Sequence, residues 1–393
     1  MAAFSGTLRT NEVYSALFNM ILAQQVFMDN FGKHQTLVEK AKQEAGLFGD
    51  TKLFYAGDVL KSKVWTGHDN EAANLLNVER APAPACQAIV IDQFRIIALS
   101  TDEYLSKRAW SSESAFSDFT SLLIGMMAET KKVYEGTLYN TYVGTHVTSV
   151  GNQSQSIDLT TALTGLSGVE KDKKEAMVIA QALADLMVEM GDYSREFNDY
   201  GYLRSYADED IKVIWNSKYL NKIRKVDLPT IFHKEGLVDK MESDVLPSRY
   251  FGTVLDASSI ATYSASTPAA GKPIDSDDSS YVPGSNHANG CVRSLVEKEV
   301  TVGGTAYHVF PGDEIPSGST VKASGTFELG ETYIEQDDII CKVVTKLPVM
   351  LTAFEASTSF YNPRALLTNR YMVWGFSKPE ALSNYPFISI KAI

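Results

Sequence analysis

The longest helical pattern in the chain lies between Ser111 and Val143. Polar residues separate apolar residues that recur three and four positions apart, namely Phe116, Phe119, Leu123, Met126, Val133, Tyr134 and Leu138. The spacing predicts one amphipathic helix of about eight turns, which Ser111 or Ser112 can cap. Its single apolar stripe leaves the other side for water or another chain. Two interpretations stay open: a spine that carries elements on either side, or a helix packed across the sheet of an α+β enzyme.

Residues 51–99 have the pattern of a long two-stranded hairpin. Leu53–Tyr55 begins the outgoing side, and two strongly β-forming runs, Ala88–Ile91 and Phe94–Ile97, form the return. A lone hairpin is only marginally stable in water. We therefore expect this one to pack on another subunit or another domain.

The remaining elements, before and after the hairpin and the long helix, are shorter. Helical spacing over residues 11–31 predicts an arm that lies on another element. Further along we expect a helix that starts at a capping box, Asp172–Glu175, and stops near Gly191; a buried strand, Ile211–Trp215; a short basic helix, Lys218–Lys225; and a short helix, Pro229–Met241.

The amino-acid composition changes twice in the last third of the chain. Residues 256–290 carry few large apolar side chains and predict an exposed loop, whereas residues 295–347 show short strands between regular turns. We interpret the second stretch as an inserted β-module. Val349–Phe360 and Leu366–Phe376 then predict two long strands joined at a turn-prone segment, Tyr361–Arg364.

Charge and cysteine content narrow the classes of function. The net charge of −12 over 393 residues argues against wrapping of nucleic acid by a basic surface. Cys86, Cys291 and Cys341 are far apart, so we expect no disulfide framework, which fits a reducing compartment. Residues 11–31 are too polar for a signal peptide or a membrane span.

No catalytic, cofactor-binding or metal-binding constellation stands out. Gly271-Lys272 lacks the glycine and hydroxyl residue of a phosphate loop, and Ser319–Lys322 matches a Ser-x-x-Lys nucleophile without its partner motifs. The six histidines have no helical metal spacing, and the acidic loop at Asp275, Asp277 and Asp278 lacks the glycine and glutamate of a calcium-binding hand. The basic run Lys218–Lys225 could contact phosphate, but a solvated helix face explains it better. We therefore assign no site residues and expect no enzyme.

The order of the elements resembles the major capsid proteins of tailed bacteriophages, which have the Hong Kong 97 fold. The resemblance is strongest over Asp210–Leu220, continuing through Ile231–Leu237 and Asp244–Gly252, and again over Val349–Phe376, with its segment Asn362–Phe376. Residues 256–347 match least. The implied fold class is α+β, with a long spine helix, an extended hairpin loop, axial and peripheral domains and an inserted small β-module.

The resemblance implies a role for each part of the chain. The implied parts are an N-terminal arm (1–50), an extended hairpin loop (51–99), a peripheral domain with the spine helix 111–143 (100–209), an axial domain (210–294), the inserted β-module (295–347) and the closing strands of the peripheral domain (348–393). The arm and the hairpin loop would lie on neighbouring subunits.

The implied function is structural. Copies of the chain would form hexamers and pentamers of an icosahedral head shell around double-stranded DNA, made in the host cytoplasm and located in the virion capsid. The implied partners are a separate scaffolding protein, a portal protein and DNA contacted non-specifically, without a membrane. Two alternatives stay open: an α+β enzyme or small-molecule binding protein with its site at the junction near Trp215 and His233, and a bacterial nanocompartment shell.

Overall fold

The computed structural model describes residues 36–45, 51–62, 80–102, 113–145, 154–225, 242–255 and 291–393, with the exception of 317, 322 and 337. The chain divides into two compact units. Unit 1 comprises Met1–Asp50, Val90–Gly136 and Met350–Lys378, and unit 2 comprises Thr51–Ile89, Thr137–Val349 and Pro379–Ile393. Both units therefore combine segments that are far apart in the sequence.

Unit 1 is built on a four-stranded sheet with the order β1-β14-β15-β4. A short helix precedes the sheet, and the elements are α2 (Thr36–Ala41), β1 (Lys42–Glu44), β4 (Gln93–Asp102), β14 (Met350–Asn362) and β15 (Leu367–Phe376). β1 runs parallel to β14, and the other neighbours are antiparallel. The predicted pair of long C-terminal strands is confirmed as β14 and β15, but the turn between them covers residues 363–366, and Tyr361 and Asn362 of the expected turn belong to β14.

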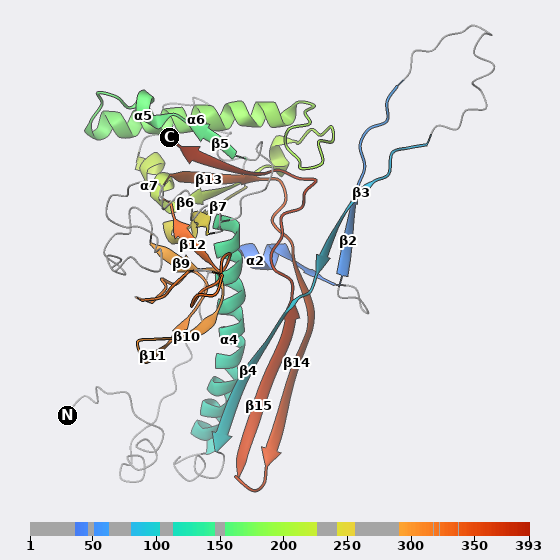
Figure 1. Cartoon of the computed structure of the whole chain (residues 1–393), viewed down its shortest axis with the longest axis vertical. Helices are drawn as coiled ribbons and strands as arrows, with labels where there is room; N and C mark the ends of the chain where they lie inside the picture. The colour runs from blue at the N-terminus through green and yellow to red at the C-terminus, as the bar shows by residue number, and fades with distance from the viewer. Residues whose placement is uncertain are drawn as a thin grey trace. The chain divides into compact units, whose positions relative to one another are not determined.

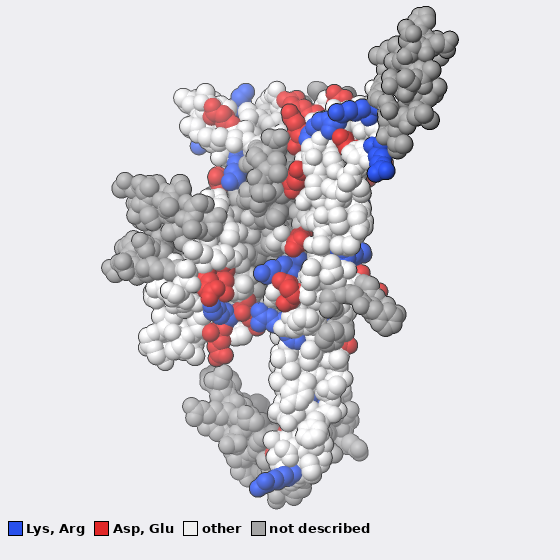
Figure 2. Space-filling view, turned by 45° about the vertical axis from the view of Figure 1, so that its right-hand side comes forward, with Lys and Arg blue, Asp and Glu red and all other residues white. Residues whose placement is uncertain are grey.

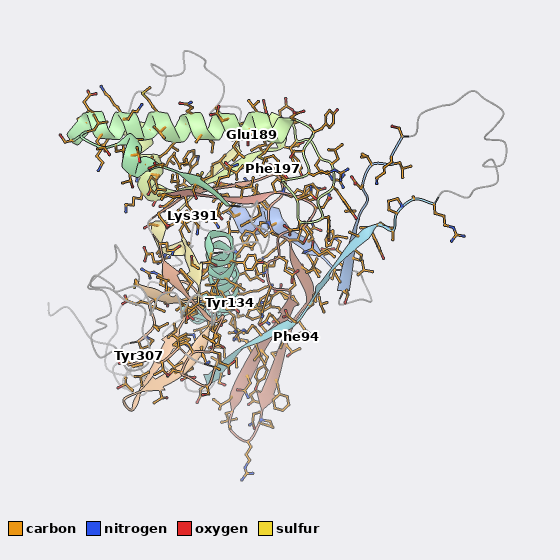
Figure 3. The ribbon with its side chains drawn as sticks, turned by 45° about the horizontal axis from the view of Figure 1, so that its top comes forward. Phe94, Tyr134, Glu189, Phe197, Tyr307 and Lys391 are labelled. Atoms are coloured by element: carbon orange, nitrogen blue, oxygen red, sulfur yellow. The ribbon has the colours of Figure 1, made fainter. Side chains whose placement is uncertain are left out.

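The predicted long helix is also confirmed. α4 runs from Glu113 to Thr145 over 33 residues, and Figure 1 shows it alongside β4 and β15. Tyr134 of this helix is buried and meets two rings of β15 edge-on, with ring centroids 6.3 Å from Trp374 and 5.7 Å from Phe376. Figure 3 labels Tyr134 in this position. Edge-to-face packing of this kind fixes the helix to the sheet of unit 1.

Unit 2 is built on a five-stranded sheet with the order β5-β16-β13-β6-β7. Its strands are β5 (Ser154–Ile157), β6 (Lys212–Asn216), β7 (Glu242–Leu246), β13 (Ile339–Val344) and β16 (Phe387–Ala392). The middle strand, β13, is antiparallel to both of its neighbours, and all six of its residues are buried. Five of the six are apolar, as a strand covered on both faces requires, and the sixth, Lys342, is buried with its Nζ donating to Ser389 Oγ at 2.6 Å.

One face of this sheet is covered by a long helix, α6 (Gly168–Gly191). Ile179, Leu183 and Leu186 of α6 share a core with Val213 and Trp215 of β6. Two shorter helices belong to the same unit, α5 (Leu159–Ala162) and α7 (Ser217–Lys225), together with the 3₁₀ turns η3 (Asp208–Asp210) and η4 (Ser248–Tyr250). The predicted buried strand and basic helix are thus confirmed as β6 and α7.

The start of α6 differs from the prediction. The helix begins at Gly168, one turn before the expected capping box, and its N-cap residue Ser167 makes no side-chain capping bond. Glu175, the expected acidic partner of the box, is instead buried within the helix. It is four residues before Ile179, so it falls on the core-facing side. The expected stop at Gly191 is confirmed.

A second, smaller β-region lies within unit 2. It contains a three-stranded sheet with the order β8-β12-β9 and a hairpin of β10 and β11. The bounds are β8 (Gly252–Val254), β9 (Val292–Ser294), β10 (Lys298–Val302), β11 (Thr305–Val309) and β12 (Thr332–Glu335). A separate apolar core that includes Val292, Phe327 and Ile334 supports it.

This region has different bounds from the predicted module of residues 295–347. β8 and β9 precede residue 295 and pair with β12 in the small β-region, whereas β13 lies in the middle of the five-stranded sheet. The difference has a physical cause, since alternation identifies strands but not their partners. α6 and β16, expected in the peripheral domain, likewise share the core of β6 in unit 2.

The predicted hairpin is present in a shorter form. β2 (Thr51–Ala56) pairs with β3 (Ala85–Val90), but the run expected to continue the return, Phe94–Leu99, lies in β4 and pairs with β15. Other predictions fall outside the described residues: the arm at 11–31, the caps Ser111 and Ser112, the helix 229–241 and the loop 256–290.

Candidate functional site

The β2–β3 hairpin carries apolar side chains that the described chain leaves exposed. Every second residue of β2 is exposed, and β3 repeats this pattern over most of its length. Leu53 is 49% exposed, Tyr55 67% and Val90 48%, and Ala88 is exposed as well. We call these four residues the hairpin patch. Large apolar side chains grouped on a small two-stranded sheet indicate a surface that another molecule covers.

Asp58, directly after β2, fastens the hairpin to the rest of unit 2. Its Oδ2 lies 2.8 Å from Arg195 Nη1, and its Oδ1 accepts the backbone N–H groups of Leu203 at 3.0 Å and Val59 at 2.9 Å. The hydrogen bond from Arg195, followed by that from Leu203, lowers the pKa of Asp58 to about 2. The carboxylate is therefore ionised, and both of its oxygens are used, throughout the neutral pH range.

Unit 1 exposes a second apolar surface, on one face of its sheet. Phe94 is 56% exposed, Ile96 61% and Phe360 62%. The strand register places all three on the same face, opposite Gly375, Val373 and Asn369 of β15. Figure 2 shows few charged atoms over β14 and β15, and Figure 3 labels Phe94 at this sheet. We call Phe94, Ile96 and Phe360 the sheet patch.

Charged residues hold the N-terminal strand of unit 1 to its helix. Lys42 of β1 donates to the buried carboxylate of Glu135 on α4. Lys131, one turn earlier on α4, lies 2.5 Å from Glu355 of β14 and 4.0 Å from Glu135. The Glu135 side chain is only 2% exposed, so these two lysines are its ion-pair partners in a buried setting.

The small β-region contains its own buried ion pair. Arg293 Nε donates to Glu335 Oε2 at 2.9 Å, and Arg293 Nη1 donates to the carbonyl of Gly312 at 3.1 Å. Tyr333 is fully buried beside it and donates to the carbonyl of Arg249 at 2.7 Å, and burial raises its pKa. These bonds pair the buried charges with each other and with the backbone, so the cluster stabilises the region.

Most of the residues considered for catalysis or metal binding lie outside the described residues. Ser319 is buried, while its expected partner Lys322, the residues 271–278 and every histidine except His308 lie outside the described residues. His308 Nε2 lies 2.9 Å from Glu297 Oε1 at the surface. In the part of the chain that the structure describes, no group of three or more His, Cys, Asp or Glu side chains could hold a metal ion.

The junction proposed for an enzyme or binding protein is occupied by core packing on its Trp215 side. Trp215 is 6% exposed and packs with α6, and His233 lies outside the described residues. Tyr219 and Leu220 of the basic helix α7 are buried in the same core. No helix within the described ranges is long and apolar enough to cross a membrane.

Comparison with known proteins identifies the family. The model of the Phi29-like phage major capsid protein family matches residues 7–377. The fold is similar to a chain in the capsid structure of Staphylococcus phage Andhra, with a TM-score of 0.55, 11% identity and coverage of 96% of this chain and 90% of that chain. It is also similar to a chain in the structure of the head fibre and inner core protein gp22 of native bacteriophage P68, with a TM-score of 0.54, 11% identity and coverage of 95% and 88%. No curated protein matches.

The two similar structures and the family match support different parts of the prediction. At 11% identity the two structures support the α+β capsid fold alone. The family match, which spans most of the sequence, confirms the resemblance seen in the sequence and favours neither the enzyme nor the nanocompartment alternative. The chain belongs to the Phi29-like phage major capsid protein family and is a structural subunit of a bacteriophage head shell.

Proposed function

We propose that copies of the chain form an icosahedral shell of hexamers and pentamers around double-stranded DNA, and that the hairpin patch is a principal contact between neighbouring copies. The observation that carries this proposal is the exposure of Leu53, Tyr55, Ala88 and Val90 on a two-stranded sheet. A shell protein needs a surface of this kind on every subunit, because each copy must bind the next in a ring that closes.

Energetics support the hairpin patch as a contact surface. A two-stranded sheet gains little stability by itself, so exposed apolar residues on it have no benefit for the isolated subunit. Full burial of one Leu or Tyr side chain contributes about 2 kcal/mol. Two such residues contribute about 4 kcal/mol to each contact, which offsets part of the cost of association, and the contribution recurs at every equivalent contact of a closed shell.

We propose the following roles for the parts of the chain. Residues 1–50 act as an arm on a neighbouring subunit, and unit 1, with its sheet and the first part of α4, acts as the peripheral domain. The five-stranded sheet of unit 2, with α6, acts as the axial domain around five- and six-fold axes. The small β-region is the inserted module. This assignment keeps α6 with the strands that share its core.

The proposed partners follow from the same role. A separate scaffolding protein and a portal protein take part in assembly in the host cytoplasm, and packaged DNA is contacted without sequence preference. The net charge of −12 supports weak DNA contact, because an acidic subunit repels phosphate and leaves packaged DNA free to move. The role is structural, without catalysis.

Substitutions in the hairpin patch test the proposal. We expect the double variant Leu53→Asp with Tyr55→Asp to remain a folded subunit but to lose shell formation, because two carboxylates would have to be buried in every contact. The matched control, Leu53→Met with Tyr55→Phe, keeps the apolar area and should assemble as the parent does. Shells are scored by electron microscopy and light scattering after co-expression with the neighbouring phage genes.

The proposal fails if the double Asp variant forms shells at the parental yield. The thermal midpoint of the unassembled subunit distinguishes a loss of shells caused by the changed contact from one caused by misfolding, because both residues are exposed and the Asp variant should melt close to the parent.

A further inference from the structure

We infer that Asp58, Gln87, Arg195, Arg204 and Asn384 form an anchor network that sets the orientation of the β2–β3 hairpin on unit 2, and thereby the angle at which one subunit binds the next. The second part of this inference rests on the proposed role of the hairpin. The first part rests on hydrogen bonds within unit 2 alone.

The anchor network holds the outgoing strand at the segment that follows β2. Asp58 accepts the Leu203 N–H with one oxygen and the Arg195 guanidinium with the other. Arg204 Nη2 donates to the carbonyl of Gly57 at 2.8 Å. Three separate bonds therefore connect two consecutive residues of the hairpin to the loop 194–204.

The returning strand is held at Gln87, in the middle of β3. Its side-chain Nε2 donates to the carbonyl of Ala381 at 3.0 Å, and its Oε1 accepts the N–H of Ser383 at 2.9 Å. Both ends of the amide are used, so the side chain fixes one position and one orientation of the strand. The partner is a different loop, 380–384, which precedes β16.

The two loops are also bonded to each other. Arg204 donates to Asn384 Oδ1 from Nε at 3.2 Å and from Nη2 at 2.8 Å, and the Asp199 N–H donates to the carbonyl of Ser383 at 2.8 Å. The contacts thus close a ring that runs from the outgoing strand through both loops to the returning strand. Rotation of the hairpin about its base would break bonds on both strands at once.

The network determines orientation without being part of the apolar core. The Asp58–Arg195 pair is partly exposed, with side-chain exposures of 19% and 53%, and such a pair contributes little by itself. Hydrogen bonds to charged groups are strongly directional, however, and here several act together. We therefore expect loss of one member to loosen the hairpin locally and to leave the global stability of unit 2 nearly unchanged.

This local effect has a consequence for the shell. The hairpin patch belongs to the same two strands, so the orientation of the hairpin fixes the direction in which a neighbouring copy binds. A ring of heterologous contacts closes only if each contact repeats the same angle. A loosened hairpin should still bind its neighbour, but at variable angles, which gives open sheets and shells of mixed size.

Alanine variants of the anchor network test the inference. The variants are Asp58→Ala, Gln87→Ala and the double variant, and the control is Glu196→Ala, which removes an exposed carboxylate next to Arg195 without removing a member of the network. Hydrogen exchange of the unassembled subunit reports on the hairpin, and electron microscopy of the co-expressed particles reports on shell diameter.

We expect the amides of Leu203 and Val59 to exchange at least about tenfold faster in Asp58→Ala, while the thermal midpoint stays at the parental value. We expect the fraction of uniform closed shells to fall several-fold in each single variant and further in the double variant. The Glu196→Ala control should match the parent in both measurements.

Uniform shells from the double variant, or unchanged exchange in Asp58→Ala, would overturn the inference. If an alanine variant loses its folded state, Asp58→Asn replaces it, since the amide keeps an acceptor for Leu203 and loses the charge that pairs with Arg195. Uniform shells from a folded Asp58→Asn variant whose exchange is unchanged would also overturn it. The hairpin-patch variants decide the proposed function independently, because they leave the anchor network intact and change only the contact surface.

Discussion

Replacement of Gly144 by alanine tests how closely α4 approaches its neighbour in unit 2. A Cβ at Gly144 would lie 2.0 Å from the carbonyl oxygen and 2.6 Å from the carbonyl carbon of Tyr250, and 3.3 Å from the Phe251 nitrogen. All three are backbone atoms, and the residues that carry them are buried. A flexible side chain could turn away from the new methyl group, but this backbone can only shift as a whole.

The structure offers a matched control in the same helix. Gly125 also lies within α4, and a Cβ there would meet nothing within 4 Å. Alanine is favoured over glycine in a helix interior by about 1 kcal/mol, so Gly125→Ala should stabilise the protein by roughly that amount. Overpacking typically costs about 1–3 kcal/mol, and because backbone must move at Gly144 we expect a cost of about 4 kcal/mol there. After the gain of about 1 kcal/mol from alanine, the net loss should be about 3 kcal/mol.

Thermal unfolding of the unassembled subunit, followed by circular dichroism, measures both effects. For a domain of this size about 1 kcal/mol corresponds to roughly 2–4 °C, so Gly144→Ala should lower the midpoint by about 6–12 °C and Gly125→Ala should raise it by about 3 °C. If the two units melt separately, the Gly144 effect belongs to the transition of unit 2. A stabilising Gly144→Ala substitution would refute the close approach of α4 to η4.

Three further predictions concern buried charge and backbone strain. Burial, and then the charge of Lys391, lower the pKa of Lys342 from 10.5 to about 7. Between these two pH values the unfolded chain binds more protons than the folded chain, so the free energy of unfolding should rise with pH. The rise should reach up to roughly 5 kcal/mol from about pH 7 to 10.5. Urea denaturation of Lys342→Met should show this rise removed, and an unchanged pH slope would contradict it. Lys42→Ala should destabilise unit 1 by about 3 kcal/mol, because it leaves a buried carboxylate without its closest cation. Glu135→Gln should destabilise it by less, because the lysine that remains can reach water. The reverse order of the two variants in urea denaturation would count against the buried pair. Leu366 has a φ of 54°, so Leu366→Asn should raise the thermal midpoint slightly, since asparagine tolerates this conformation at lower cost, and a clear fall would argue against it.

Local patterns in the sequence identified the elements whose own residues determine them. Helical spacing is enough to identify α4, because its apolar stripe continues over many turns. Alternation and a turn-prone Asn-Pro segment identify β14 and β15 for the same reason. The start of α6 was misplaced, since Asp172 and Glu175 match a capping box in sequence while Glu175 faces the core four residues before Ile179.

Strand partners could not be predicted in the same way. β4 follows β3 almost directly, so continuity suggested one return strand, yet β4 pairs with β15 from the far end of the chain. β13 follows β12 as closely, yet it lies in the middle of another sheet between β6 and β16. A period of two determines which residues share a face, whereas the partner depends on which apolar faces remain to be buried in the whole fold.

The anchor network shows why the contacts that position the hairpin escape sequence reasoning altogether. Asp58 meets Leu203 across 145 positions and Gln87 meets Ala381 across 294. Asp58 follows β2 and Gln87 lies within β3, and local patterns assign such polar residues to turns or to solvent. Apolar contacts in place of these bonds would give a periodic hydrophobic pattern in the sequence. They would also pack the hairpin against the core of unit 2 and bury the hairpin patch. Polar, directional bonds fix the hairpin in one orientation and keep the hairpin patch accessible to another subunit. The strands of the hairpin are therefore visible in the sequence as alternating patterns, whereas the bonds that orient it leave no such pattern.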